Sequence, residues 1–236
     1  MTLICINCKH PLKTLGLSEL SYFQCDKCGI VIKKNEVNSS IDSKHVKYMK
    51  NDRYNEKLAV TIKDLIDNLK YNSEKLDLNL ISEFIKTILL SDTIFIGASG
   101  QSKLIGSAFC MRLCHLGLKS FIMGEITSPQ ILPEDCLIII SRFGEKNPEL
   151  VYAKKAKSQG CKILFITSNP SSKIAELSDI TWNVSSLNKD HLETVSDNSI
   201  FEITSQFLLD GLITELVVEL NLYESSLKNK HFNLEQ

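Results

Sequence analysis

The sequence predicts an α/β domain built on a parallel sheet and preceded by a small cysteine-rich module. Beyond Asp92, short apolar runs alternate with segments of helical periodicity, which is typical of βαβ units. Four of the eight cysteines lie within the first 28 residues, in two closely spaced pairs. At 236 residues, the chain is long enough for one sizeable core and one small additional module.

The overall charge argues against nucleic acid as a partner. The 27 basic and 28 acidic residues leave a net charge of -1, so no global field is available for non-specific binding. The longest apolar run, centred on Leu137–Ile140, is far shorter than the ~20 residues of a membrane-spanning helix. The N-terminus lacks the basic-then-apolar pattern of a signal peptide. We therefore expect a cytoplasmic protein that does not insert into membranes.

Changes in composition divide the chain into four segments. Residues 1–35 are dense in Cys and Lys and form the cysteine-rich module. Residues 36–55 lack an apolar period and are predicted to be a linker that is partly helical near its end. Residues 56–226 form the α/β domain, and residues 227–236 form a terminal tail.

Within the α/β domain, two helical patterns precede five strands, and further helices follow the strands. The expected strands are Thr93–Ile96, Ser120–Met123, Cys136–Ile140, Lys162–Ile166 and Ile180–Val184. The expected helices are Leu58–Leu69, Leu80–Leu89, Ser102–Leu116, Pro148–Gln159, Ser172–Leu177 and Ser199–Leu222.

The paired cysteines have the spacing of a metal site. Cys5 and Cys8 form one C-x2-C pair, Cys25 and Cys28 form another, and sixteen residues separate the pairs. At this spacing two knuckles fold toward one another and close a tetrahedral site of four thiolates. This predicts a zinc ribbon with one structural zinc ion per chain. The alternative, four cysteines without a metal, requires the paired spacing to arise by chance. His10 is not counted, because four thiolates already fill a structural site.

A segment of ~35 residues has too little core to fold unaided, so zinc would supply the folding free energy of the ribbon. The ribbon would then provide a stable surface that contacts another molecule, and a protein is one candidate partner. Its lysines either meet phosphates or form a solvated face, and the scarcity of aromatic and arginine residues favours the solvated face. The remaining cysteines lie in apolar stretches and are expected to be thiols rather than a disulfide framework: Cys110, Cys114, Cys136 and Cys161.

The segment that follows the first expected strand, Gly97-Ala98-Ser99-Gly100-Gln101-Ser102, is a small-residue turn that leads into a helix. The first amides of such a helix lack intrahelical partners, so an anionic or polar group can dock there. Further blocks follow in a characteristic order: Ala108–Gly117 (A-F-C-M-R-L-C-H-L-G), Gly124–Pro129, Ile139–Ser141, Ala153–Lys157 and Ile166–Pro170.

These blocks resemble the sugar isomerase (SIS) domain and, within it, the 6-phospho-3-hexuloisomerase family, over roughly residues 57–222. The resemblance implies an SIS-type, flavodoxin-like, five-stranded parallel sheet sandwiched by helices. It implies a homodimer or homotetramer with sites near subunit contacts. It also implies conversion of a phosphorylated sugar, a hexulose 6-phosphate, without a metal or organic cofactor in the reaction.

The chain departs from the family pattern in its phosphate loop. The family typically has S-x-S-G-x-T, whereas this chain has Ser141-Arg142-Phe143-Gly144-Glu145-Lys146. In one interpretation Arg142 and Lys146 replace the lost hydroxyls with charge. Asn147 is then the expected N-cap and Pro148 the first residue of a helix whose positive end points at the same place. In the other, Phe143 fills the pocket and the ligand is lost. The residues expected to bind the ligand are Gly100, Ser102, Ser141, Arg142, Gly144 and Lys146.

Isomerisation through an enediolate requires a carboxylate base and a donor beside the carbonyl oxygen. By resemblance, Glu202 after Phe201 is the catalytic base, although the Pro-Met/Leu-Gly-Thr stretch usual before it is absent. His115 in the His-Leu-Gly block is its expected catalytic partner, or else a histidine that favours a helix C-terminus. Arg112 is expected to form an ion pair at a subunit contact or else to reach the phosphate. His191 is expected to lie in a surface loop or else to cover the site.

Two functions of different classes fit the sequence. The first is an isomerase that interconverts a hexulose 6-phosphate and fructose 6-phosphate, with Glu202 and His115 transferring protons. The second is a non-catalytic sugar-phosphate sensor or scaffold that acts through its zinc ribbon. The altered phosphate loop favours the second function, whereas the retained Phe-Glu pair and His-Leu-Gly block favour the first.

Overall fold

The computed structural model describes residues 8, 10, 12–15, 22–28, 31–33, 51–185 and 197–222. The chain divides into two compact units, Met1–Ile62 and Lys63–Gln236. Several predicted features lie outside the described residues, namely Cys5, His191, the first part of the linker (residues 36–50) and the tail (residues 227–236).

The first unit contains a three-stranded antiparallel sheet in the order β1-β2-β3 (Leu12–Leu15, Tyr22–Cys25 and Val31–Lys33). In the register of β1 and β2, Leu12 lies opposite Cys25. The beginning of β1 is therefore beside the end of β2. This pairing brings the chain just before β1 and the turn just after β2 to the same end of the sheet.

The second unit is built on a five-stranded parallel sheet, as the sequence predicts. The strand order is β5-β4-β6-β7-β8, and each neighbouring pair is parallel. Each strand lies within about two residues of its expected position, because a buried parallel strand is a short, nearly continuous apolar run. The strands are β4 (Ile94–Ala98), β5 (Ser120–Ile122), β6 (Cys136–Ile140), β7 (Lys162–Thr167) and β8 (Ile180–Asn183).

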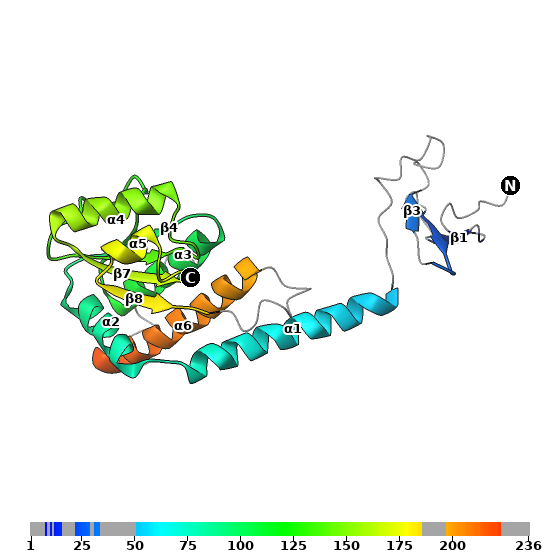
Figure 1. The fold of residues 1–236 in the computed structure, drawn as a ribbon, viewed down its shortest axis with the longest axis horizontal. Coiled ribbons are helices and arrows are strands. Elements are labelled where there is room, and N and C mark those ends of the chain that lie inside the picture. Colours follow the sequence, from blue (N-terminus) through cyan, green and yellow to red (C-terminus); the bar gives the residue numbers. More distant parts are fainter. Residues whose placement is uncertain are drawn as a thin grey trace, which may run out of the picture. The chain divides into compact units, whose positions relative to one another are not determined.

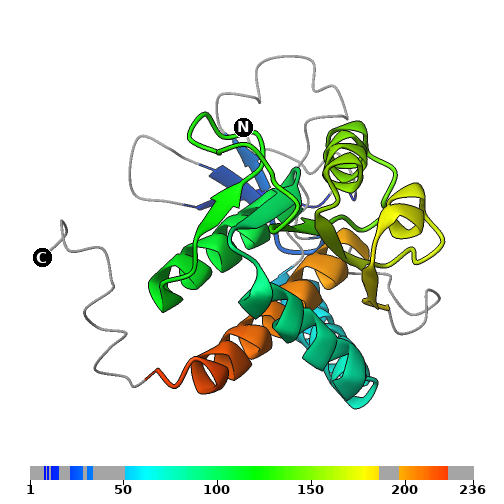
Figure 2. The same ribbon diagram turned by 90° about the vertical axis from the view of Figure 1, so that its left-hand side faces the viewer.

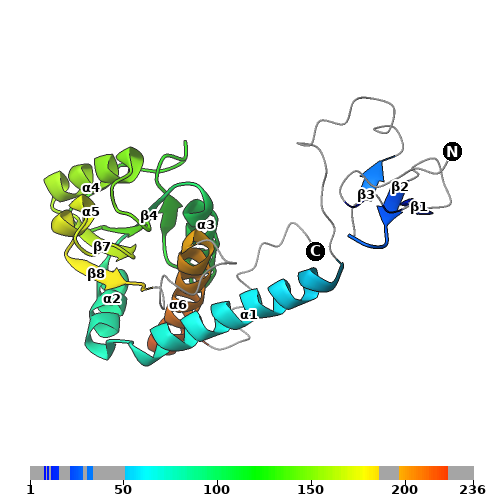
Figure 3. The ribbon, with the colours of Figure 1, turned by 45° about the vertical axis from the view of Figure 1, so that its right-hand side comes forward.

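Helices cover both faces of this sheet, so the unit has three layers (Figures 1 and 3). On one face, Phe95, Ile139 and Phe165 form a core with α4 (Asn147–Gln159) and α5 (Lys173–Leu177). The alternate residues of the same strands point to the other face, where α2 (Leu78–Leu90), α3 (Gln101–Leu116) and α6 (Asp197–Glu219) complete the second core.

The helix α6 runs alongside α3, in orange and green in Figure 2. An ion pair between Arg112 of α3 and Asp210 of α6 joins the two helices, and Gln206 donates to the same carboxylate at 3.1 Å. The predicted ion pair of Arg112 is therefore formed within this chain, whereas it was expected at a subunit contact.

Among the described residues, no helix combines the length and the apolar character needed to cross a membrane.

The helix α1 (Asn51–Glu74) begins within the predicted linker and extends beyond the expected helix. Its last turns are tied to the end of β8, because the Asn72 side chain donates to Ser185 O at 2.8 Å and accepts from Ser185 N at 3.1 Å. The apolar stripe that predicts this helix remains largely exposed, as the relative exposures of Leu58 (60%) and Ile66 (57%) show. The periodicity thus predicts the helix correctly but does not reveal whether its apolar stripe is covered.

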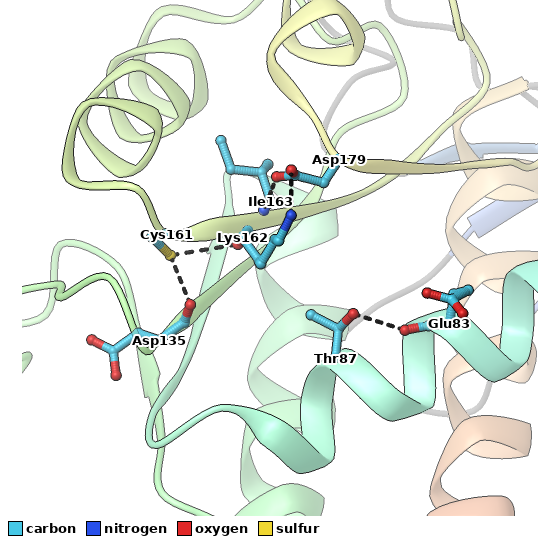
Figure 4. A network of polar contacts seen from close by, with 7 residues as sticks. All are labelled: Glu83, Thr87, Asp135, Cys161, Lys162, Ile163 and Asp179. Carbon is cyan, nitrogen blue, oxygen red and sulfur yellow. Dashed lines mark hydrogen bonds and ion pairs between the residues drawn. The ribbon is translucent and has the colours of Figure 1, made fainter.

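A polar network surrounds the beginning of β7 (Figure 4). Asp179 accepts from Ile163 N at 2.9 Å and from Lys162 Nζ at 3.0 Å. Partial burial opposes ionisation, but these two donors hold the pKa of the Asp179 carboxyl below its ordinary value. Nearby, the Cys161 thiol donates to Asp135 O at 3.2 Å. The network fixes the start of β7 against the segment that precedes β6.

Candidate active site

The candidate active site lies at the carboxyl ends of β4 and β6, where the strand order reverses. From β4 the chain crosses to β5 on one side, and it then returns to add β6 on the other side. At such a switch point the loops that follow the two strands diverge and leave a crevice, which is where open α/β sheets bind ligands. The two loops here are residues 99–100 and residues 141–146.

The loop after β4 is shaped by Gly100, which has φ 60° and ψ -137° and serves as the N-cap of α3. Other residues adopt this conformation with strain. A Cβ at this position would meet no atom within 4 Å, so the space beside the backbone is open. No side chain caps the helix, and Lys103 N donates to Gly100 O at 3.1 Å, so the two amides before Lys103 are the ones that a polar ligand can meet.

Ser102 and Glu202 form the centre of the site, although one hundred residues separate them in sequence. The Ser102 hydroxyl donates to Glu202 Oε1 at 3.3 Å. Ser102 is buried, and the second carboxylate oxygen of Glu202 is buried without a hydrogen-bond partner among the described residues. A buried carboxylate oxygen without a partner is rare in folded proteins, and it marks Glu202 as a candidate functional residue.

Two cations of the loop after β6 act on this carboxylate. Burial raises the pKa of the Glu202 carboxyl above its ordinary value, while the hydrogen bond from Ser102 and the positive charges of Lys146 and Arg142 oppose the rise. The structure thus brings together four of the predicted site residues from three separate segments. A carboxylate with a raised pKa beside two cations is typical of proton-transfer chemistry on an anionic ligand.

The loop after β6 is held rigidly by the segment that follows β7. Arg142 O accepts from Ser168 N at 3.1 Å and from the Thr167 hydroxyl at 2.9 Å. Gly144 has φ 66°, and a Cβ there would lie 2.1 Å from Ser172 Oγ. Glycine is therefore required at this position both for the backbone conformation and for space.

The Phe143 side chain is half-exposed rather than buried, which favours the first of the two interpretations of the altered loop. Its side chain is 49% exposed, and the Arg142 guanidinium lies over its ring at 4.7 Å from the centroid. The Asn169 side-chain amide donates a hydrogen bond to Phe143 O at 3.2 Å. The phenyl ring instead provides a surface on which the guanidinium packs, an arrangement worth ~0.5–1 kcal/mol at an exposed site.

The helix α4 begins one residue earlier than expected. Its N-cap is Lys146, and Asn147 is already helical, so the expected capping role of Asn147 is wrong. Pro148 still lies in the first turn, where its missing N–H costs nothing. Lys146 is exposed, whereas Ser141 at the beginning of the loop is buried.

Two polar residues that the sequence analysis missed are buried in the two helices that border the site. Glu149, in the first turn of α4, and Ser205, one turn after Glu202 in α6, are 1% and 0% exposed. Glu149 Oε2 and Ser205 Oγ have no hydrogen-bond partner among the described residues. For Ser205 the three-residue spacing from Glu202 was an available signal, because it places both on one helix face.

His115 does not join this group within one chain. It lies in the last turn of α3, whereas Ser102 lies in the first. At 1.5 Å per residue, thirteen residues separate the two positions by ~20 Å along the helix. Any role of His115 in the chemistry at Glu202 would thus need a second copy of the chain.

The predicted metal ligands that are described lie together in the first unit. The sulfur atoms of Cys8, Cys25 and Cys28 are all within 4.8 Å of one another. His10 is exposed and is not part of this group.

A separate apolar groove of about 1130 Å³ lies between α1, α2 and α6 in the second unit. None of the predicted ligand-binding or catalytic residues lines it. It has few convergent polar groups, and its exposed apolar side chains include Ile66, Leu78, Leu90 and Phe207. The groove is therefore separate from the candidate site at the switch point.

The loop geometry at Gly144 gives a direct test of the site. Gly144→Ala is expected to lower the free energy of unfolding by ~2–4 kcal/mol, through left-handed strain and overpacking against Ser172. Gly211→Ala is the control, because this helical glycine has open space around it and alanine should stabilise by up to ~1 kcal/mol. Urea denaturation measures both. Equal effects of the two substitutions would show that the loop is not held as described.

Comparison with known proteins places these observations in a family. The SIS domain model matches residues 88–212, which include both loops and Glu202. A 3-hexulose-6-phosphate isomerase of Methanocaldococcus jannaschii is 36% identical over 66% of this chain and 84% of that protein. The one of Methylomonas aminofaciens is 31% identical over 78% of this chain and 99% of that protein.

A solved structure agrees with the sequence comparison. The crystal structure of a Methanococcus jannaschii protein, from which a function of 3-hexulose-6-phosphate isomerase is inferred, has a TM-score of 0.66 and 33% identity. The similarity covers 76% of this chain and 99% of that chain. On the shared fold, the matched residues and the identity to these relatives, the chain belongs to the SIS domain family.

Proposed function

We propose that the protein is a sugar-phosphate isomerase that interconverts 3-hexulose 6-phosphate and fructose 6-phosphate. The observation that carries this proposal is the buried Ser102–Glu202 pair, with an unpartnered carboxylate oxygen, beside the cations Arg142 and Lys146. The relatives named as 3-hexulose-6-phosphate isomerases support the choice of substrate.

In the proposed reaction, the Glu202 carboxylate takes the proton from C2 of the 3-hexulose. The electron pair of that C–H bond forms the C2–C3 double bond of an enediolate, with the negative charge on O3. Glu202 then returns the proton to C3, while the proton of the O2 hydroxyl moves to O3. The carbonyl is now at C2, which gives fructose 6-phosphate without any net gain or loss of atoms.

The raised pKa of Glu202 suits this role. A carboxylate that is partly desolvated is a stronger base than one in water, and its proton is exchanged more readily near neutral pH. Ser102 holds one oxygen of the carboxylate, so the other oxygen keeps a fixed direction. Positioning of this kind removes much of the entropic cost of bringing the base to the C–H bond.

The loop after β6 is proposed to hold the phosphate of the substrate. Arg142 and Lys146 supply charge, and α4 begins at Lys146, so its amino end adds a partial positive charge. Hydroxyl groups usual in the family are thus replaced by cations. The hydrogen bonds that Thr167 and Ser168 donate to the Arg142 carbonyl fix the backbone before the ligand arrives.

A non-catalytic sugar-phosphate sensor is the second candidate. It is favoured by the same loop, because only one hydroxyl of the family pattern is retained and Phe143 occupies the place of another. Such a protein would bind the sugar phosphate through Arg142 and Lys146 without turning it over. Its signal would pass through the cysteine-rich module to a partner protein.

Self-association is also proposed, because His115 lies ~20 Å from Ser102 along α3 and requires a second copy to serve a site. The groove between α1, α2 and α6 carries the exposed apolar side chains that an interface between copies would bury. A homodimer or homotetramer is the assembly that we propose.

Phe207→Lys should shift the protein toward the monomer, since Phe207 lines the groove and is 60% exposed. Val218→Lys is the matched control, because Val218 is equally exposed on the same helix but does not line the groove. Light scattering after size-exclusion chromatography measures the mass. A wild-type protein that is monomeric at tens of micromolar would refute self-association.

Arg142→Ala should weaken binding of fructose 6-phosphate by a factor of ~10–100, as expected when a charge-assisted hydrogen bond worth ~1.5–3 kcal/mol is lost. The thermal shift on ligand addition measures this. Lys154→Ala removes an exposed charge from α4 and should leave the shift unchanged. If neither fructose 6-phosphate nor inorganic phosphate shifts the wild-type melting temperature at millimolar concentration, the loop does not bind phosphate and both candidate functions fail.

Glu202→Gln keeps the size of the side chain but removes the base, so kcat should fall by ~10²–10⁴ while binding changes little. In the wild type, kcat/KM should rise with pH through a pKa above 4.5, because the active form is the carboxylate and burial raises its pKa. If wild-type protein binds fructose 6-phosphate but does not isomerise it, the sensor is the correct function.

A further inference from the structure

The cysteine-rich module presents a second site, independent of the isomerase proposal. The SIS domain model begins at residue 88, so no part of its match covers this module. The antiparallel pairing of β1 and β2 places Leu12 opposite Cys25. Cys8 precedes β1 by a few residues, and Cys28 follows β2 within the turn Asp26–Cys28. The fold of three short strands therefore brings these cysteines to one end of the sheet.

The sulfur atoms have the separation of ligands around one ion. Thiolates bound to zinc at ~2.3 Å in a tetrahedron lie ~3.8 Å from one another. The sulfur atoms of Cys8 and Cys25 are 3.4 Å apart, and those of all three described cysteines are within 4.8 Å. A disulfide would need a sulfur separation of ~2.05 Å, so Cys8 and Cys25 are not joined by one.

The burial of Cys25 agrees with a bound ion. Cys25 is 0% exposed, although the module has few residues to form a core. Asp26, next to Cys25, is paired with Lys13 of β1 at 2.5 Å, which ties the second cysteine turn to the first strand. A module of this size does not bury enough apolar surface to fold alone, and binding of a metal is the usual source of the missing free energy.

We propose that the module binds one zinc ion through the thiolates of Cys8, Cys25, Cys28 and Cys5. Cys5 lies outside the described residues and is chosen because the C-x2-C spacing with Cys8 matches that of Cys25 and Cys28. Four protein thiolates close the coordination shell, so the ion has a structural role and does not take part in the isomerase reaction. The soft sulfur ligands favour zinc or iron over magnesium, calcium or manganese.

The test is the metal content of the full-length chain purified with reductant. Mass spectrometry of the elements should find about one zinc per chain and no stoichiometric iron. Cys25→Ser should lose this zinc. The matched control is Cys114→Ser, because Cys114 is an exposed cysteine on α3, outside the cluster, and this variant should keep its zinc.

If Cys25→Ser does not fold, a spectroscopic measurement on the wild-type protein still tests the proposal. Cobalt exchanged into the wild-type protein should give the near-ultraviolet thiolate-to-cobalt band and the visible bands of tetrahedral coordination. Four results would each overturn the proposal. They are less than about half a zinc per chain after reconstitution, stoichiometric iron, equal zinc in Cys25→Ser and wild type, and octahedral cobalt bands. Isomerase activity is not a readout, so this result is separate from that of the proposed function.

Discussion

The parallel pairing of β4 with β6 is the constraint on which the site depends. This register places Ala98 beside Ile140, so the two loops that follow these residues start side by side. One loop gives Ser102 at the head of α3, and the other gives Arg142 and Lys146. The helix α6, packed against α3, then brings Glu202 to Ser102. A residue from the last helix thus lies beside loops from the centre of the sheet.

The electrostatic balance at Glu202 follows from this geometry. Desolvation alone would favour a protonated carboxyl, which is a poor base at neutral pH. Arg142 and Lys146 offset part of that effect, and the hydrogen bond from Ser102 offsets more. The cations of the altered loop therefore have two proposed roles, since they would bind the phosphate and keep the base ionised. A loop of hydroxyl groups performs only the first of these.

Local patterns predict the strands and helices well. A buried parallel strand is an apolar run and a helix has an apolar period, and both patterns lie within a few neighbouring residues. The apolar run Cys136–Ile140 forms β6 with its expected bounds. The sequence also predicts Ser102 and Glu202, but by resemblance, since a contact between residues one hundred positions apart has no local signal. The burial of Glu149 was missed because tertiary packing decides it, whereas the spacing of Ser205 from Glu202 was an available signal. The same limit applies to α1, whose apolar face is predicted correctly but is left exposed.

The most direct test of the account follows the carbonyl group itself. Fructose 6-phosphate labelled with ¹³C at C2 is incubated with the protein and observed by NMR. With the wild type, the signal of the labelled C2 should change from that of a ketose carbon to that of a secondary alcohol carbon as the 3-hexulose forms. With Glu202→Gln the signal should not change. Conversion at the same rate by both proteins would contradict the assignment of Glu202 as the base.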